Sequence, residues 1–191
     1  MRLPYIDQNP TMDNAEDRAV LERVLERRGG KLIELDRALL HAPPVADGWN
    51  SFLKAIRTQT SLSTAVREIA ICRVAILNHA WYEWDHHCPI LRDSSEITEE
   101  GVQYVLKAPH YAKDADSPLD AKHQAVLAYS DAMTLDVKVP DAVFEKLKSQ
   151  FSDREVVEIT ATVAAYNTVS RFLVALDVGE TNSRSGPAAK Q

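Results

Sequence analysis

The chain has 191 residues, of which 45% are hydrophobic and 26% are charged, and its formal net charge is -6. These fractions are ordinary for a single globular domain and argue against disorder. The acidic balance gives no electrostatic reason to bind nucleic acid or an anionic membrane, because both require clustered Lys and Arg.

Two further absences in the sequence bear on its location. No apolar run reaches ~18 residues, and the start of the chain is polar, so neither a membrane span nor a secretion signal is predicted. Two cysteines are too few for a disulfide framework. We therefore expect a cytoplasmic protein.

The sequence predicts one helix after another. Residues 1–12 contain Pro4 and Pro10 and are expected to form an extended arm, residues 13–178 the helical domain, and residues 179–191 a flexible polar tail. Beyond the arm, every apolar stretch has helical spacing, and glycines and prolines separate the stretches. The first predicted helix is capped by Asp13 or Asn14 and ends at about residue 28. The others span residues 34–41, 45–59, 65–90 with a break at Asn78, 94–107, 119–135, 140–150 and 153–177.

Two segments of the chain resemble each other. One runs from Ser63 to Asn78 and the other from Ser152 to Asn167, each with a Ser cap before an apolar helix. A duplicated helical hairpin would explain the similarity, but two amphipathic helices also become similar by chance, and both explanations stay open.

The candidate catalytic residues lie in the most apolar segment. Glu83 and His87 are four residues apart, so on a helix they share one face and can hydrogen-bond. Glu68 comes one helix earlier and would face the same pocket if the chain reverses near Asn78. The alternative is that Glu83 and His87 form an ordinary surface pair and that Glu68 forms an ion pair with a neighbouring arginine. The flanking aromatic residues favour a small-molecule pocket instead, and they are Trp81, Tyr82 and Trp84.

Metal and thiol chemistry are less well supported. Glu83-x-x-His86 matches the pattern of carboxylate-bridged di-iron bundles, but it occurs once, and a triad with His79 and His87 spans too much helix, so no metal is expected. Cys72 reads as a core residue, and Cys88, next to His87, has no second cysteine three residues away to resolve an oxidised form.

The pattern Arg67-Glu68, Asn78 and Tyr82-Glu83-Trp84-x-x-His87 resembles the carboxymuconolactone decarboxylase branch of the alkylhydroperoxidase D-like superfamily. The likeness runs from about Leu3 to Asp177. It implies an all-α, single-domain, alkylhydroperoxidase D-like helical bundle with a duplicated helical hairpin, assembled as a homo-trimer or homo-hexamer.

Two departures from the relatives affect the site. The alkylhydroperoxidase D branch has a Cys-x-x-Cys pair before the histidine, and those positions are Ala80 and Glu83 here, whereas Glu68 and His87 match that branch's proton relay. His79 stands where relatives commonly have glycine, which bears on the turn between the helices.

The resemblance implies a cofactor-independent lyase that decarboxylates, or isomerises, a small carboxylated lactone or aromatic-derived acid. We expect His/Glu acid–base chemistry, in which His87, polarised by Glu83 or Glu68, delivers a proton. The alternatives are an alkylhydroperoxidase-type redox protein that uses Cys88 and a non-catalytic helical binding subunit. Among the arginines that could hold an anionic substrate, Arg57, Arg67 and Arg73, we favour Arg73, and we expect His86 to point away from the pocket because adjacent helical residues diverge by about 100°. The predicted catalytic residues are Glu68, Glu83 and His87, and the predicted substrate-binding residues are Arg73, Trp81, Tyr82, Trp84 and His79.

Overall fold

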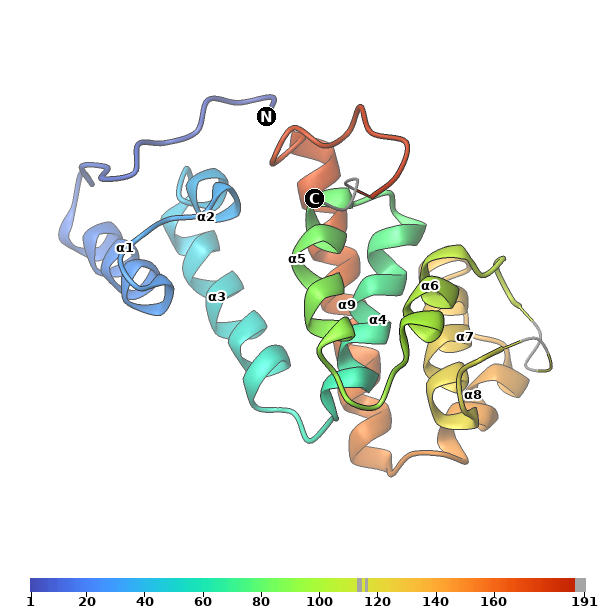
Figure 1. Ribbon diagram of the computed structural model, residues 1–191. Coiled ribbons are helices and arrows are strands. Elements are labelled where there is room, and N and C mark those ends of the chain that lie inside the picture. The colour runs from blue at the N-terminus through green and yellow to red at the C-terminus, as the bar shows by residue number, and fades with distance from the viewer. Residues whose placement is uncertain (113–114, 116, 188–191) are drawn as a thin grey trace.

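The computed structural model describes residues 1–112, 115 and 117–187, and within these residues it consists of helices and loops without a strand (Figure 1). The prediction of an all-α fold is confirmed. The helices are α1 (Ala15–Arg28), α2 (Glu34–Leu39), α3 (Pro43–Thr58), α4 (Thr64–Leu77), α5 (Trp81–Arg92), α6 (Glu99–Lys107), α7 (Ala121–Leu135), α8 (Asp141–Lys148) and α9 (Asp153–Leu176).

Helix α4 forms the centre of the core. It packs against α5, α7 and α9. Helices α1 to α3 lie on one side of α4, α5 and α9, and α6 to α8 lie on the other (Figure 1). The Ser63 side chain caps α4 by accepting a hydrogen bond from the Val66 amide. Most of α4 is buried, which includes the charged residues Glu68 and Arg73, so both must be paired.

A short turn at Asn78 to Ala80 separates α4 from α5, as the sequence predicts. Asn78 ends α4, but the left-handed residue is His79, with φ of 55°. Glycine adopts this conformation without the steric cost that a side chain adds. The turn therefore has its left-handed residue at His79, where a glycine would fit without strain.

The asparagines of the two similar segments lie against each other. Asn78 Nδ2 donates to Asn167 Oδ1 at 3.2 Å and to Ser170 Oγ at 2.7 Å, which joins the end of α4 to the middle of α9. Ser152 caps α9 as Ser63 caps α4. The equivalent caps fit a duplicated hairpin, which stays a prediction.

The N-terminal arm contacts residues 176–180, at the end of α9 and just beyond it. The Arg2 amide donates to Leu176 O at 2.8 Å, and the Gly179 amide donates to the Tyr5 hydroxyl at 2.8 Å. Further along the tail, Arg184 pairs with Asp85 at 2.6 Å. The flexibility predicted for residues 179–191 stays a prediction, and residues 188–191 lie outside the described residues.

Among the described helices, α9 is long and apolar enough to cross a bilayer by length and composition. Half of its most apolar window is buried against the rest of the protein. A core helix passes the same test, and α9 packs on α3, α4 and α7.

Candidate active site

A cavity of about 230 Å³ lies between the N-terminal helices, α5 and α9. Five of its lining residues come from one face of α5, because positions i, i+1, i+4, i+5 and i+8 of a helix point to the same side. The lining residues are Arg28, Ile33, Leu35 and Arg57 from the N-terminal part, Tyr82, Glu83, His86, His87 and Ile90 from α5, and Val169 and Leu173 from α9.

Glu68 and His87 form a buried pair at this cavity. His87 Nδ1 lies 2.7 Å from Glu68 Oε2, and Arg67 Nε donates to the other carboxylate oxygen of Glu68 at 3.2 Å. The reversal of the chain after α4 therefore brings the two residues together, as the spacing predicts. Both Glu68 oxygens are engaged, so the carboxylate fixes the orientation of the imidazole.

The other ring nitrogen of His87 faces Tyr166 on α9. His87 Nε2 lies 3.2 Å from the Tyr166 hydroxyl, and Arg57 Nε donates to the same hydroxyl at 2.7 Å. Sequence reasoning named Arg57 only as one of three arginines and missed Tyr166. The one signal for Tyr166 was a phenol within an apolar helix, where a buried hydroxyl needs a partner.

These contacts define one consistent direction of donation. Burial lowers the pKa of His87, and this is opposed by the hydrogen bond that His87 donates to Glu68, which favours the charged imidazolium. A neutral imidazole donates through Nδ1 to Glu68 and accepts at Nε2 from the Tyr166 hydroxyl. The series then runs from Arg57 through Tyr166 and His87 to Glu68.

Glu83 lines the cavity without the hydrogen bond that we predicted. Both of its carboxyl oxygens are buried and have no hydrogen-bond partner among the residues that the structure describes. Burial raises the pKa of Glu83 well above its usual range, opposed by the charge of Arg57. His87 is directed to Glu68 and Tyr166 instead, because those residues lie across from its two ring nitrogens.

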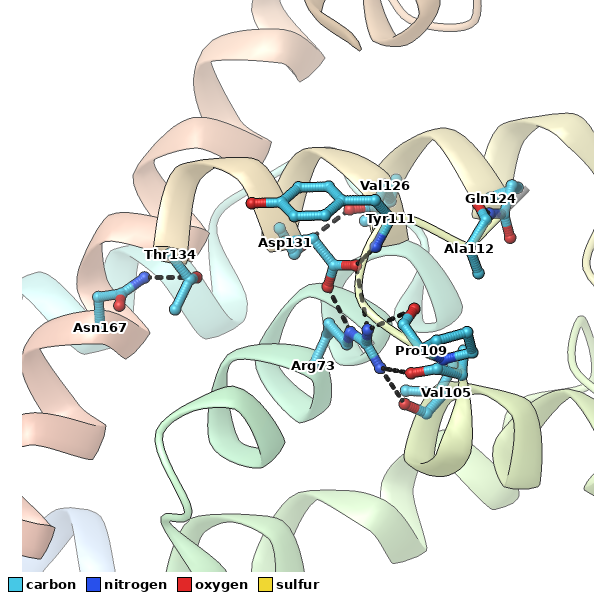
Figure 2. A network of polar contacts seen from close by, with 12 residues as sticks. Arg73, Val105, Pro109, Tyr111, Ala112, Gln124, Val126, Asp131, Thr134 and Asn167 are labelled. Carbon is cyan, nitrogen blue, oxygen red and sulfur yellow. Dashed lines mark hydrogen bonds and ion pairs between the residues drawn. The ribbon is translucent and has the colours of Figure 1, made fainter. Parts of the chain in front are cut away.

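Arg73, the arginine that we favoured for substrate, is held elsewhere in the core (Figure 2). Its guanidinium donates to both carboxylate oxygens of Asp131 on α7, with Nη2 to Oδ2 at 3.0 Å, and to the carbonyl oxygens of Val105 and Ala108 at 3.1 Å. This arrangement ties α4 to α7 and to the end of α6. The cavity arginines are Arg57 and, at its edge, Arg28, which is paired with Asp36.

Of the aromatic and histidine residues predicted to bind substrate, Tyr82 lines the cavity, and its hydroxyl donates to Glu34 Oε2 at 3.1 Å. The predictions for Trp81, Trp84 and His79 are not supported, since the described lining residues do not include them. Trp81 and Trp84 are one turn apart on another face of α5, where Trp81 Nε1 donates to Arg184 O at 3.1 Å. His79 is exposed in the turn.

His86 reaches the rim of the cavity, contrary to prediction. Its ring packs on Tyr82 with centroids 4.3 Å apart, and its Nδ1 lies 2.7 Å from Tyr82 O. Consecutive helical residues are rotated by about 100°, and a cavity with a wide opening can still be lined by both His86 and His87. His86 is exposed and lies at the rim of the cavity, whereas His87 is buried.

Both cysteines are buried thiols. Burial raises the pKa of the Cys72 thiol well above its usual range, with nearby Glu68 acting in the same direction. A thiol is a poor nucleophile when burial keeps it protonated. In the described part of the chain, no group of three or more His, Cys, Asp and Glu side chains is placed to hold a metal ion.

Residues 43–112, which contain Glu68, Glu83 and His87, match the family model "Carboxymuconolactone decarboxylase family". The resemblance to this family is confirmed. Comparison with curated protein sequences gives no significant match.

Solved structures show the same fold. A peroxidase-related protein of Ralstonia eutropha with an alkylhydroperoxidase AhpD core has a TM-score of 0.74 at 19% identity, over 93% of this chain and 90% of that one. A peroxidase-related protein of Silicibacter gives 0.70 at 17% identity, over 94% of each chain. The debrominase Bmp8, solved with 2,3,4-tribromopyrrole, gives 0.68 at 18% identity, over 92% of each chain. These identities establish the fold and leave the reaction open.

Proposed function

We propose that this carboxymuconolactone decarboxylase-like protein is a cofactor-independent lyase that decarboxylates, or isomerises, a small carboxylated lactone or aromatic-derived acid. The observation that carries the proposal is the Glu68–His87 pair, joined through Tyr166 to Arg57, at a cavity of about 230 Å³. Such a volume suits a small ring compound. The independence from a cofactor follows from the family resemblance.

Arg57 is the residue best placed to hold an anionic substrate. It lines the cavity, and its side chain is already fixed by the Tyr166 hydroxyl and by stacking over the Tyr166 ring, 5.6 Å from the ring centroid. A guanidinium pairs with carboxylates through directed N–H groups. Arg57 also borders an open groove of about 640 Å³ between α1 and α3, whose other charged lining residues are the basic Arg23, Arg27 and Lys54 and the acidic Glu26 and Asp47.

Decarboxylation requires two things of the site, which are stabilisation of a developing negative charge and delivery of a proton. When the carbon–carbon bond to the carboxylate breaks, carbon dioxide leaves and the electron pair moves toward a neighbouring carbonyl oxygen of the substrate. Arg57 stabilises that oxygen, because a fixed charge acts more strongly in a partly buried site than in bulk water. A proton must then reach the substrate carbon.

Turnover with defined compounds tests the proposal. Purified protein is incubated with a panel of carboxylated lactones and aromatic acids, and carbon dioxide release and the product spectrum are followed. We expect at least one compound to lose carbon dioxide or to isomerise without added metal or redox cofactor. His87→Asn should lower the rate by ~100-fold or more. A panel that the wild-type protein leaves unchanged would contradict the lyase proposal and favour a binding role.

The redox alternative has a separate test, since structural neighbours are peroxidase-related proteins. We expect the Cys72→Ser, Cys88→Ser double variant to keep most of the lyase activity at matched folded fraction. The burial of both thiols is the reason. Peroxide-dependent loss of titratable thiol, together with turnover that disappears in this variant, would support the redox function instead.

We also propose assembly as a homo-trimer or homo-hexamer, as the resemblance implies. Large apolar side chains are exposed on α3 and α5, with Phe52 at 48% and Ile90 at 41% of their maximal exposure. Exposed apolar surface of this kind favours association. Light scattering at micromolar concentration is expected to give a multiple of the 21.3 kDa chain mass, and a monomer would contradict the proposal.

A further inference from the structure

We propose that Glu83 is protonated in the resting protein and is the group that delivers the proton to the substrate, while Glu68 and His87 act as positioning residues. This inference rests on the proposed function. The general acid of the reaction would then be Glu83. The sequence predicted a hydrogen bond between Glu83 and His87, but His87 contacts Glu68 and Tyr166 instead.

The first support is the isolation of the Glu83 carboxyl group. Glu83 is 2% exposed, lines the cavity, and neither oxygen has a partner within the described residues. A carboxylate that is buried without partners is strongly disfavoured in its ionised form, so such a group takes up a proton instead. A neutral carboxylic acid on a residue that lines a cavity can donate its proton to a bound substrate.

The second support is the saturation of His87. Its Nδ1 is engaged by Glu68 at 2.7 Å and its Nε2 by Tyr166 at 3.2 Å, so neither nitrogen points freely at the cavity. For His87 to donate to a substrate, it would have to break one of these contacts. Glu83 breaks none.

The surrounding charges agree with this division. Arg57 is the cation that faces Glu83, and the pKa of Glu83 is nevertheless raised because burial outweighs that charge. A neutral Glu83 leaves Arg57 unopposed for an anionic substrate, whereas an ionised Glu83 would repel one. The titratable and charged groups around Glu83 are Arg28 from α1, Arg57 from α3, Glu68 and Cys72 from α4, His86 and His87 from α5, and Tyr166 from α9.

The proton balance of the step is complete. Carbon dioxide departs and leaves the electron pair on the substrate, delocalised onto its carbonyl oxygen. The O–H bond of Glu83 then breaks as the new C–H bond forms, so that Glu83 ends as a carboxylate. One proton from water restores the acid after the product leaves, and this is the proton that decarboxylation consumes in each turnover.

The first test needs no substrate. We would record the infrared carbonyl band of protonated carboxylic acids at neutral pH in the wild type, in Glu83→Gln and in Glu68→Gln. The band should be present in the wild type and in Glu68→Gln and absent in Glu83→Gln. A neutral-pH spectrum without the band, or a band that survives in Glu83→Gln, would overturn the proposal.

Thermal melting against pH gives a second, independent measurement. A Glu whose folded pKa is raised contributes stability that is present below its unfolded value of 4.5 and lost as pH rises through the folded pKa. Glu83→Gln lacks this loss, so its Tm minus that of the wild type should increase by several degrees between pH ~4 and ~8. Glu100→Gln, on the exposed side of α6, is the matched control and should show no such trend. A flat difference for Glu83→Gln would count against a protonated Glu83.

Turnover separates this inference from the proposed function. If the wild type releases carbon dioxide, Glu83→Gln should lose ~100-fold or more of the rate, since Gln cannot supply the proton. The wild-type rate should also fall at high pH as Glu83 ionises. A Glu83→Gln variant that turns over at the wild-type rate would refute the donor role while leaving the lyase proposal intact.

Discussion

His87 Nδ1 on α5 lies 2.7 Å from Glu68 Oε2 on α4, which makes one buried acid–base pair from residues 19 positions apart. The turn at Asn78 to Ala80 sets this distance, because it lets the two helices run back along each other. Glu68, once paired, holds the imidazole in one tautomer.

Replacement of either member of this pair should impair turnover. His87→Asn and Glu68→Gln are expected to lower kcat by ~100-fold or more while circular dichroism shows an unchanged helix content, because the contacts that hold Tyr166 and Arg57 in place at the cavity are lost. His86→Asn is the control, because His86 is exposed at the rim, and it should keep most of the activity. Loss of activity in His86→Asn with an active His87→Asn would contradict this assignment.

The pH dependence of stability should reveal the neutral state of His87. Its folded pKa is lowered by burial, so its contribution to stability is present above the unfolded value of 6.5 and is lost as pH falls below it. In urea unfolding from neutral to acidic pH, the wild type should therefore lose stability near this value more steeply than His87→Asn. Identical pH profiles for the two proteins would argue against a buried neutral imidazole.

Tyr166→Phe tests the contact between Arg57 and His87. The ring stays and only the hydroxyl that both residues contact is lost, so we expect stability to fall by ~1 kcal/mol and turnover by about 10-fold. Tyr104→Phe serves as the comparison, since the buried Tyr104 hydroxyl has no partner in the described part of the chain. That variant should be at least as stable as the wild type and fully active.

Arg73 should matter for folding and leave substrate affinity unchanged. Arg73→Met leaves Asp131 buried without its cation, which is expected to cost ~3–5 kcal/mol in denaturant unfolding. Adding Asp131→Leu should recover part of this, although the Tyr111 amide then loses its acceptor. At matched folded fraction the KM should equal that of the wild type, and a large rise in KM would restore Arg73 as a substrate residue.

His79→Gly should stabilise the protein. His79 has φ of 55°, a conformation that costs an L-residue ~1–2 kcal/mol, part of which is offset by the greater freedom of glycine in the unfolded chain. The expected net gain is up to ~1 kcal/mol in urea unfolding. His79→Ala keeps a Cβ and should show no such gain, so equal effects of the two substitutions would mean that the turn is not strained.

Local patterns in the sequence were sufficient for the helices and the break after α4, and they placed Glu68 and His87 at one pocket. They paired His87 with Glu83, whereas the structure pairs it with Glu68. Helical spacing, Ser caps and Gly or Pro breakers are properties of neighbouring residues, and a reversal between two consecutive helices places their facing positions in register. The sequence was a poorer guide to which face of α5 lines the cavity. Trp81 and Trp84 looked like a pocket wall from composition, but both are buried on another face of α5, where Trp81 contacts the tail. Tyr82, Glu83, His86 and His87 line the cavity instead.

Only the tertiary structure decided which distant residues complete the site. Tyr166 and Arg57 come from α9 and α3 and meet at His87 because those helices pack beside α5, and Arg73 is withdrawn from the cavity because α7 presents Asp131 to it. The same packing removes every described partner from Glu83. Side chains far apart in the chain meet according to how helices pack, which the spacing of residues within any one helix does not encode.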